Sequence, residues 1–157
     1  MPQLDPSALL ERLLNEGYGP GAWHGPDLKA AIADVTPELA MFRPAPGRHN
    51  IAEITLHVAY WIHVVRGRLT GTPPGPFLTE GEDWFPLSPE AGPSWEQITA
   101  ELAAQQRAAV ALAAGLGAGT VQAALPETEV FNQVLGLGCH AIYHAGQIQL
   151  IKKLAGR

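Results

Sequence analysis

Histidines are the residues of this chain whose type and spacing best suit chemistry. Six are present, namely His24, His49, His57, His63, His140 and His144. His140 and His144 are four residues apart, so on a helix their side chains lie one above the other on one face. Neutral imidazole is the commonest metal ligand among side chains. The pair therefore favours a metal site, if a helix carries it and a further ligand reaches it.

The segment from Pro126 to about Leu154 is the helix that we expect to carry this pair. Its apolar stripe consists of Val130, Val134, Leu137, Ala141, His144, Ile148 and Ile151. Counted at 100° per residue from Val130, the stripe covers about 300° to 40°. His144 falls inside it at about 320°, and His140 lies at its border at about 280°. Both imidazoles are thus expected at the interior of the fold or at its edge.

A second helix is expected from Asn50 to Gly71. Asn50 and Glu53 have capping-box spacing, and the apolar stripe consists of Ile51, Ile54, Val58, Trp61, Ile62, Val65 and Leu69. His57 lies at the edge of this stripe, whereas His63 is expected to face away. The two other histidines, His24 and His49, are expected in loops or as hydrogen-bond donors at the start of a helix.

His57, His140 and His144 are therefore the candidate metal ligands. A buried neutral imidazole needs partners for both nitrogens, and the surrounding Ile, Val, Leu, Ala and Trp residues offer none. A shared divalent metal would satisfy one nitrogen of each ring, and three protein ligands leave a coordination position open, as in catalytic sites. Two alternatives stay open: a metal that only stabilises the fold, and a metal-free core with hydrogen-bonded histidines.

Several residues near these histidines have weaker assignments. Ala141 stands where a His-Glu-x-x-His protease carries its general base, which argues against peptide hydrolysis. Glu53 is expected as the capping residue, with a fourth ligand or a partner of a ligand as the alternative. Cys139 is interpreted as a buried small residue rather than a nucleophile. Side chains that could orient a bound water or substrate are Gln147, Tyr143 and Tyr60.

The elements that must position these side chains are all helical. A first helix is expected after Asp5-Pro6, ended by Gly17 and Gly19-Pro20, and short helices after Pro26 and Thr36. Ser94 and Gln97 form a second capping box, which opens a long helix that ends in the glycine cluster 115–119. Since no alternation typical of strands is sustained, the sequence predicts an all-α four-helix bundle.

The proline-rich segment 71–93 is expected to lack helix. A connection of this length is often a lid or binding loop, and here Phe77, Trp84 and Phe85 would wall the pocket. A simple crossover along the bundle is an equal alternative. Leu56 and Tyr60 form a second apolar face on the helix from Asn50, which we interpret as a dimer seam or as a surface covered by the N-terminal segment.

Composition limits the number of domains, the partners and the location that we expect. The 157 residues are 46% apolar, which suits a single domain over 1–157. The net charge of −5, without a basic cluster, argues against nucleic acid as a partner. No apolar run is long enough for a membrane span, and residues 1–20 lack a signal-peptide layout. With a single cysteine no internal disulfide forms, and we expect a cytoplasmic protein.

The motifs around the histidines resemble the DinB/YfiT-like superfamily. They are Glu-Ile-Thr-Leu-His-Val-Ala-Tyr-Trp at 53–61 and His-Ala-Ile-Tyr-His-Ala-Gly-Gln at 140–147, together with Trp-His-Gly-Pro at 23–26 and Arg-Pro-Ala-Pro-Gly at 43–47. The resemblance implies a four-helix bundle with up-down-down-up connectivity, often a homodimer. It also implies one divalent metal, commonly nickel or zinc, held by a histidine triad that maps onto His57, His140 and His144.

The resemblance further implies an enzyme acting on a small-molecule substrate. Members with known activities are mainly thiol-S-transferases that use a low-molecular-weight thiol, with an isomerase among them. The expected function is therefore conjugation of such a thiol to a small electrophile. The alternatives are a metal-dependent hydrolase that uses a metal-bound water, and a non-enzymatic metal-binding stress-response bundle.

Overall fold

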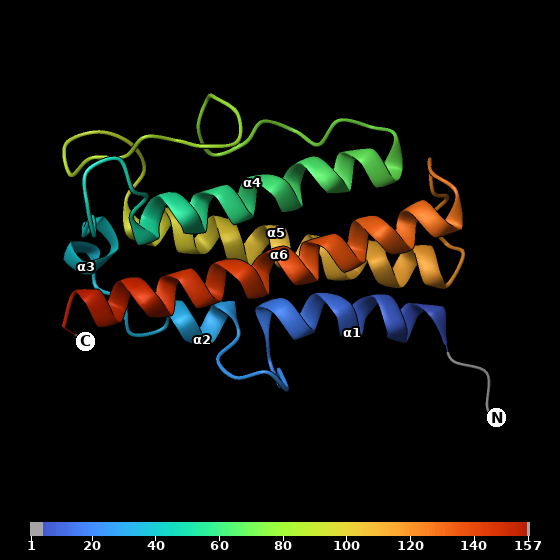
Figure 1. The fold of residues 1–157 in the computed structure, drawn as a ribbon. Helices are drawn as coiled ribbons and strands as arrows, with labels where there is room; N and C mark the ends of the chain where they lie inside the picture. Colours follow the sequence, from blue (N-terminus) through green and yellow to red (C-terminus); the bar gives the residue numbers. More distant parts are fainter. Residues whose placement is uncertain (1–4, 157) are drawn as a thin grey trace.

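Six helices form the regular structure of the computed structural model, which describes residues 5–156. Four are long, namely α1 (Pro6–Tyr18), α4 (Ile51–Thr70), α5 (Trp95–Gly117) and α6 (Glu127–Leu154); two are short, α2 (Leu28–Ile32) and α3 (Pro37–Met41) (Figure 1). The described residues form no strand, only an isolated bridge between Ser88 and Ala91. The all-α class is confirmed. No helix within residues 5–156 is long and apolar enough to cross a bilayer.

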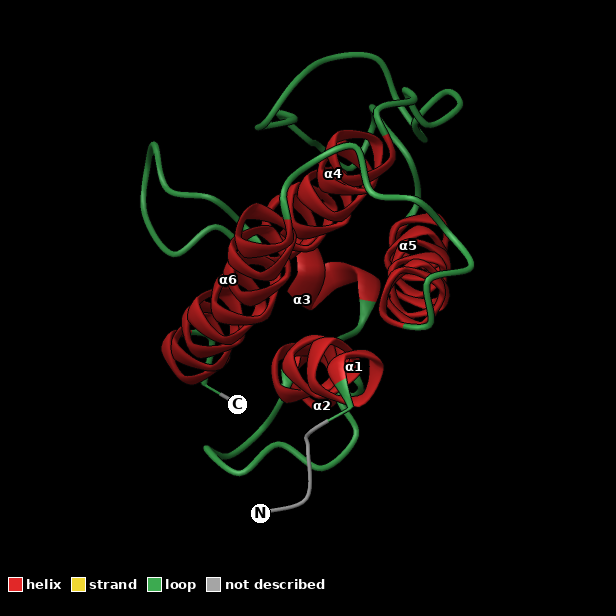
Figure 2. Cartoon of the chain, turned by 90° about the vertical axis from the view of Figure 1, so that its right-hand side faces the viewer, coloured by secondary structure: helices red, strands yellow, loops and turns green. Residues whose placement is uncertain are grey.

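The four long helices occupy the corners of a square when the molecule is viewed end on (Figure 2). α6 packs against α1 and α4, and α5 packs against the same two helices. Side chains from several helices meet without solvent exposure between them, among them Leu28, Leu56, Ile98, Leu102 and Ile148. α4 and α6, which carry the three candidate ligands, are therefore in direct contact with each other.

Side-chain caps confirm the predicted starts of α1, α4 and α5. The Asp5 side chain accepts from the Ser7 N–H at the start of α1. Both halves of the capping box are formed by Asn50 and Glu53 at α4 and by Ser94 and Gln97 at α5. These side chains satisfy backbone N–H groups that have no partner within the helix. The boundaries of the site-bearing helix α4 thus follow from local chemistry.

Gly17 has a different role from the one that we expected. It lies within α1, which ends at Tyr18 and has Gly19 as its C-cap, with φ of 109°. A Cβ on Gly17 would lie 2.5 Å from the Gly138 carbonyl oxygen, and a Cβ on Gly138 would lie 2.5 Å from that of Leu13. Gly17 therefore allows α1 and α6 to cross closely, instead of ending the helix.

The segment 71–93 lacks helix, as predicted, and lies along α4 (Figure 1). Its Phe77 and Phe85 rings pack on Tyr60, with centroids 5.5 and 5.4 Å away. Leu56 is fully buried. The loop, rather than the N-terminal segment, thus covers Tyr60. With Leu56 buried, this face offers little exposed apolar surface for a dimer seam.

Candidate metal centre

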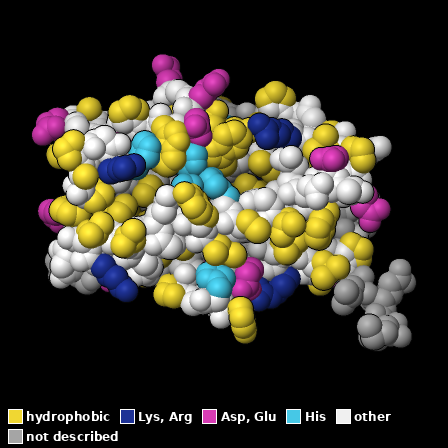
Figure 3. Space-filling view, viewed as in Figure 1, with side chains coloured by type: hydrophobic (Ala, Val, Ile, Leu, Met, Phe, Trp, Pro, Cys, Tyr) yellow, Lys and Arg dark blue, Asp and Glu magenta, His cyan; other side chains and the backbone are white. Residues whose placement is uncertain are grey.

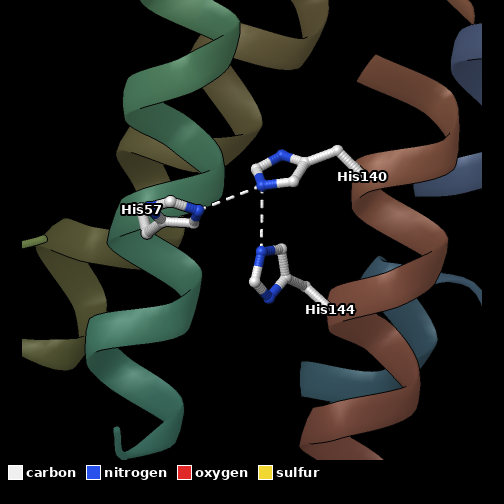
Figure 4. A group of neighbouring side chains, drawn as sticks. All are labelled: His57, His140 and His144. Carbon is white, nitrogen blue, oxygen red and sulfur yellow. Dashed lines mark hydrogen bonds between the residues drawn. The ribbon is translucent and has the colours of Figure 1, made fainter. Parts of the chain in front are cut away.

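Three imidazoles converge between α4 and α6 (Figure 4). The Nε2 atom of His140 lies 3.0 Å from Nε2 of His57 and 2.9 Å from Nε2 of His144. One nitrogen from each ring lies within 4.8 Å of the others, so the group could hold a metal ion. His57 and His144 are buried, and His140 is half-buried. The structure thus brings together the three histidines selected from helix spacing.

The outer nitrogens of two rings face hydrogen-bond acceptors. His57 Nδ1 lies 2.9 Å from the carbonyl oxygen of Asp83, which can only accept. His144 Nδ1 lies 2.6 Å from Oε1 of Gln147, whose Nε2 in turn donates to the Tyr143 hydroxyl at 3.1 Å. Both Nδ1 atoms therefore carry the proton. In a neutral ring the Nε2 atom then presents a lone pair towards the centre.

Burial keeps the three rings neutral. Desolvation, followed by the neighbouring His144, lowers the pKa of His140 to about 4. Desolvation likewise lowers the pKa of His144 to about 4, although the hydrogen bond with Gln147 acts to raise this pKa. The pKa of His57 is also lowered, mainly by burial. At neutral pH the centre therefore offers unprotonated nitrogens, the form that binds metals.

Counting protons shows why a cation fits this centre. The lone pairs of His57 and His144 both face Nε2 of His140, which bears at most one proton when the ring is neutral. One N–H cannot satisfy two acceptors, so at least one buried lone pair lacks a donor. A cation among the three nitrogens would accept all three lone pairs. Three imidazoles suit zinc, nickel, copper or iron.

Trp84 covers one side of the centre from the loop 71–93. Its ring stacks nearly parallel on the imidazoles of His57 and His49, with ring centroids 3.9 and 3.6 Å apart. The preceding residue, Asp83, has φ of 61° and accepts from the Trp61 indole N–H at 2.7 Å through its carboxylate. An aspartate tolerates this left-handed conformation better than most residues. The loop is therefore pinned to α4 where it contacts His57.

Glu53 is a tether between loops and not one of the converging ligands. Its carboxylate accepts from Arg43 at 2.5 and 3.0 Å, from the Leu87 N–H at 3.1 Å, and lies 3.1 Å from His49 Nδ1. Burial acts to raise the pKa of this carboxyl, but the hydrogen bonds from Arg43 and Leu87 outweigh it and leave the pKa lowered. The capping role that we expected is present as well.

Other residues of interest lie elsewhere or act differently from our expectations. Cys139 is exposed, not buried: it lies nine residues after Val130, at about 180° and opposite the apolar stripe. His63 is half-buried rather than turned away, with Nδ1 3.3 Å from the Gln105 amide. His24 is an exposed loop residue beside the Glu16 carbonyl, as predicted.

The sequence patterns missed two residues that support the centre, Asp83 and His49. Both lie in loops, where no periodicity shows which way a side chain points. The one signal for this region was the aromatic content of the loop 71–93, and Trp84 does contact the histidines. The contact between Gln147 and His144 could have been predicted from the sequence, because residues three apart on a helix lie on the same face.

One comparison with known proteins gives a match. The family model of the DinB superfamily matches residues 22–148, a span that includes all three converging histidines. No curated protein and no solved structure matches the chain significantly.

Proposed function

The chain belongs to the DinB superfamily by this match, and we propose that it is a metal-dependent thiol-S-transferase. Its cofactor would be one divalent cation, zinc or nickel, held by the Nε2 atoms of His57, His140 and His144. The observation that carries the proposal is the convergence of these atoms, two of which must present lone pairs. Three ligands leave room for a sulfur atom from a cosubstrate.

The cation would supply one piece of chemistry, a lowered pKa of a coordinated low-molecular-weight thiol. The protein supplies the orientation. Gln147 and the Asp83 carbonyl keep two Nε2 atoms directed at the centre, and Trp84 shields His57 from water. In the transfer, sulfur bonds to an electrophilic carbon, the thiol proton goes to solvent, and the leaving group departs from that carbon.

Metal content and thiol conjugation, measured on the same samples, test the proposal. Purified protein is analysed for metals and assayed with glutathione, bacillithiol and mycothiol against monochlorobimane. We expect about one metal ion per chain and a thiol-dependent rate, as for a single three-histidine site. His140→Ala should lose both, whereas His24→Ala, which changes an exposed histidine outside the centre, should keep both.

Three other results would point to other functions. Metal without conjugation, but with hydrolysis of activated esters, would favour a hydrolase. A His144→Ala variant that loses metal and melts far lower, in a protein without catalytic activity, would favour a structural metal. A metal-free protein whose stability does not respond to zinc or nickel would contradict the proposal altogether.

The finer features of the resemblance are proposals too. In Figure 1, α4 and α5 run away from the end that carries α3, while α1 and α6 run towards it; this supports up-down-down-up connectivity. We also propose that residues 1–157 form one domain, with residues 1–4 and 157 outside the described part, and that the protein is a cytoplasmic homodimer. Analytical ultracentrifugation tests the oligomeric state.

A further inference from the structure

A cavity of about 450 Å³ adjoins the metal centre. Trp84, His144 and Gln147 form its inner wall, and the loop 43–49 and the last turns of α6 form its sides. This volume lies in the range of small-molecule sites. A larger cavity, of about 760 Å³, lies between α3 and the start of α5, but none of the three histidines lines it. Of these two cavities, only the smaller one is lined by a histidine of the centre, His144.

One wall of this cavity is apolar and open to solvent. Tyr143, Leu150 and Leu154 are 63, 58 and 61% exposed, and they account for three of the large apolar side chains that protrude from the described surface. They lie on the outer face of α6, with Ile54 and Ile151 deeper in the cavity. Exposed apolar side chains that gather in a concave site indicate a ligand with an apolar body.

The charge on the cavity wall has one sign. Arg48 is its only permanently charged side chain, and no Asp or Glu lines the cavity, although the chain as a whole carries 15 acidic and 10 basic residues. The nearby Arg43 is neutralised by Glu53 and also donates to the Arg48 carbonyl oxygen. No ion pair or hydrogen bond of the Arg48 guanidinium is found within residues 5–156.

Figure 3 shows this face of the molecule, where histidine side chains reach the surface at its middle. A basic side chain lies beside a further histidine to the left of them, with hydrophobic side chains around both. A guanidinium offers paired N–H donors that match a carboxylate or a similar planar anion. A ligand that bridges from Arg48 to the histidines would pass along the apolar wall.

We propose that this cavity binds an amphipathic organic acid, with its anionic group on Arg48 and its apolar body along Leu150 and Leu154. The inference rests on the proposed function in one respect, that this acid is taken as the electrophilic substrate. The end of the acid remote from its anionic group would then face His144. Binding of the acid itself needs no metal, and this separates the two proposals experimentally.

Calorimetry with simple probes tests the acid site. Octanoate, octanol and octylamine are titrated into zinc-loaded and chelator-treated protein. We expect octanoate to bind about tenfold more tightly than octanol in both forms, the effect of one charge-assisted hydrogen bond. Arg48→Gln should remove most of this preference, and Arg48→Lys should retain part of it. Arg107→Gln, an exposed change on α5 away from the cavity, should leave it unchanged.

The contradicting outcomes are distinct. Equal binding of octanoate and octanol would overturn the inference. A preference for octanoate seen only with zinc, and unchanged in Arg48→Gln, would place the carboxylate on the metal, overturning the inference while supporting the metal site. If the protein cannot be loaded with zinc at all but still prefers octanoate, the missing metal would contradict the proposed function and the acid site would stand. If Arg107→Gln also lost the preference for octanoate, the effect would come from the overall charge of the protein, and the inference would be overturned.

Discussion

At the scale of single residues, the centre depends on what holds the outer nitrogens of its histidines. Gln147 is one residue whose removal tests this directly, because its Oε1 is the acceptor for His144 Nδ1 at 2.6 Å. Without it the ring can rotate or change tautomer, and the lone pair no longer faces the centre. Partners of this kind are typically worth about 10–100-fold in metal affinity.

We therefore predict that Gln147→Leu weakens zinc binding by about 10–100-fold, whereas Gln147→Glu, which retains an acceptor oxygen, binds zinc at least as tightly as the wild type. Competition with a chromophoric chelator measures both affinities. An unchanged affinity in Gln147→Leu would show that the tautomer of His144 does not depend on this contact.

The lowered pKa values of His140 and His144 predict how the metal-free protein responds to acid. Both are about 4 in the folded state against 6.5 for an unperturbed histidine. As pH falls below 6.5, the unfolded chain binds protons that the folded chain does not, so stability is lost between about pH 6.5 and pH 4. Below about pH 4 both states are protonated and this loss stops.

Imidazole NMR resonances of the metal-free protein provide the measurement. At least two of the six histidines should stay neutral well below pH 6, and the melting temperature should fall over the same interval. In a His140→Gln/His144→Gln variant the fall should be smaller. Titration of all six histidines above pH 6 would contradict the buried, neutral centre.

Residue spacing predicted the three converging histidines because all of them lie on helices, where position in the sequence sets direction. The same count, applied to Cys139, would have placed it opposite the stripe, so its assignment as buried was an avoidable error. Asp83 and His49 could not be placed in this way. Their contacts depend on the paths of loops, which side chains distant in sequence determine.

At the scale of elements, the crossing of α1 over α6 sets how closely these helices approach. Gly17 and Gly138 face each other there, and the Leu13 carbonyl oxygen is 2.5 Å from where a Cβ of residue 138 would lie. Gly138 is two residues from the candidate ligand His140. A wider crossing would therefore shift the part of α6 that carries the candidate metal centre.

We predict that Gly138→Ala lowers the free energy of unfolding by about 1–3 kcal/mol, the cost of overpacking. The matched control is Gly136→Ala on the same helix, where nothing lies within 4 Å of an added Cβ. This exposed change should stabilise the protein by up to about 1 kcal/mol, because alanine is the better helix former. Urea unfolding measures both; equal effects of the two variants would show that the crossing has room.

The loop 71–93 is held to α4 by the Glu53 tether. We predict that Glu53→Gln lowers the free energy of unfolding by about 2 kcal/mol, since a neutral amide makes weaker hydrogen bonds with Arg43 and the Leu87 N–H. Hydrogen exchange should become faster in segments 43–49 and 83–87, which Glu53 joins.

Glu90→Gln is the control for the tether, because Glu90 is exposed and lies in the same loop. It should change neither stability nor exchange. Unchanged exchange in Glu53→Gln would show that Trp84 and the aromatic contacts on Tyr60 hold the loop without the carboxylate.

Helices were more predictable than the way they cross. Capping residues and apolar periodicity marked the starts of α4 and α5, because both signals act within a few residues. Gly17 was misinterpreted as a terminator, since a sequence alone does not show whether a glycine ends a helix or makes room for a neighbour. The loop was recognised as irregular, but which face of α4 it covers depends on the ring contacts of Phe77 and Phe85.

At the scale of the whole molecule, the arrangement of the four long helices brings the three candidate ligands together from two neighbouring helices. α4 and α6 are adjacent corners of the square, so one candidate ligand from α4 and two from α6 meet beside a cavity without acidic residues. A buried four-ligand site would only stabilise the fold. A three-ligand site next to a cavity has room for chemistry.

X-ray absorption spectroscopy of the zinc-loaded protein is the most direct test of this account. The wild type should show three imidazole nitrogens at about 2.0–2.1 Å from zinc. His144→Ala should lose the ion or show two such ligands, and His24→Ala should match the wild type. Failure to bind stoichiometric zinc or nickel, or a coordination shell that is the same in His144→Ala, would contradict the central claim that these three histidines hold one cation.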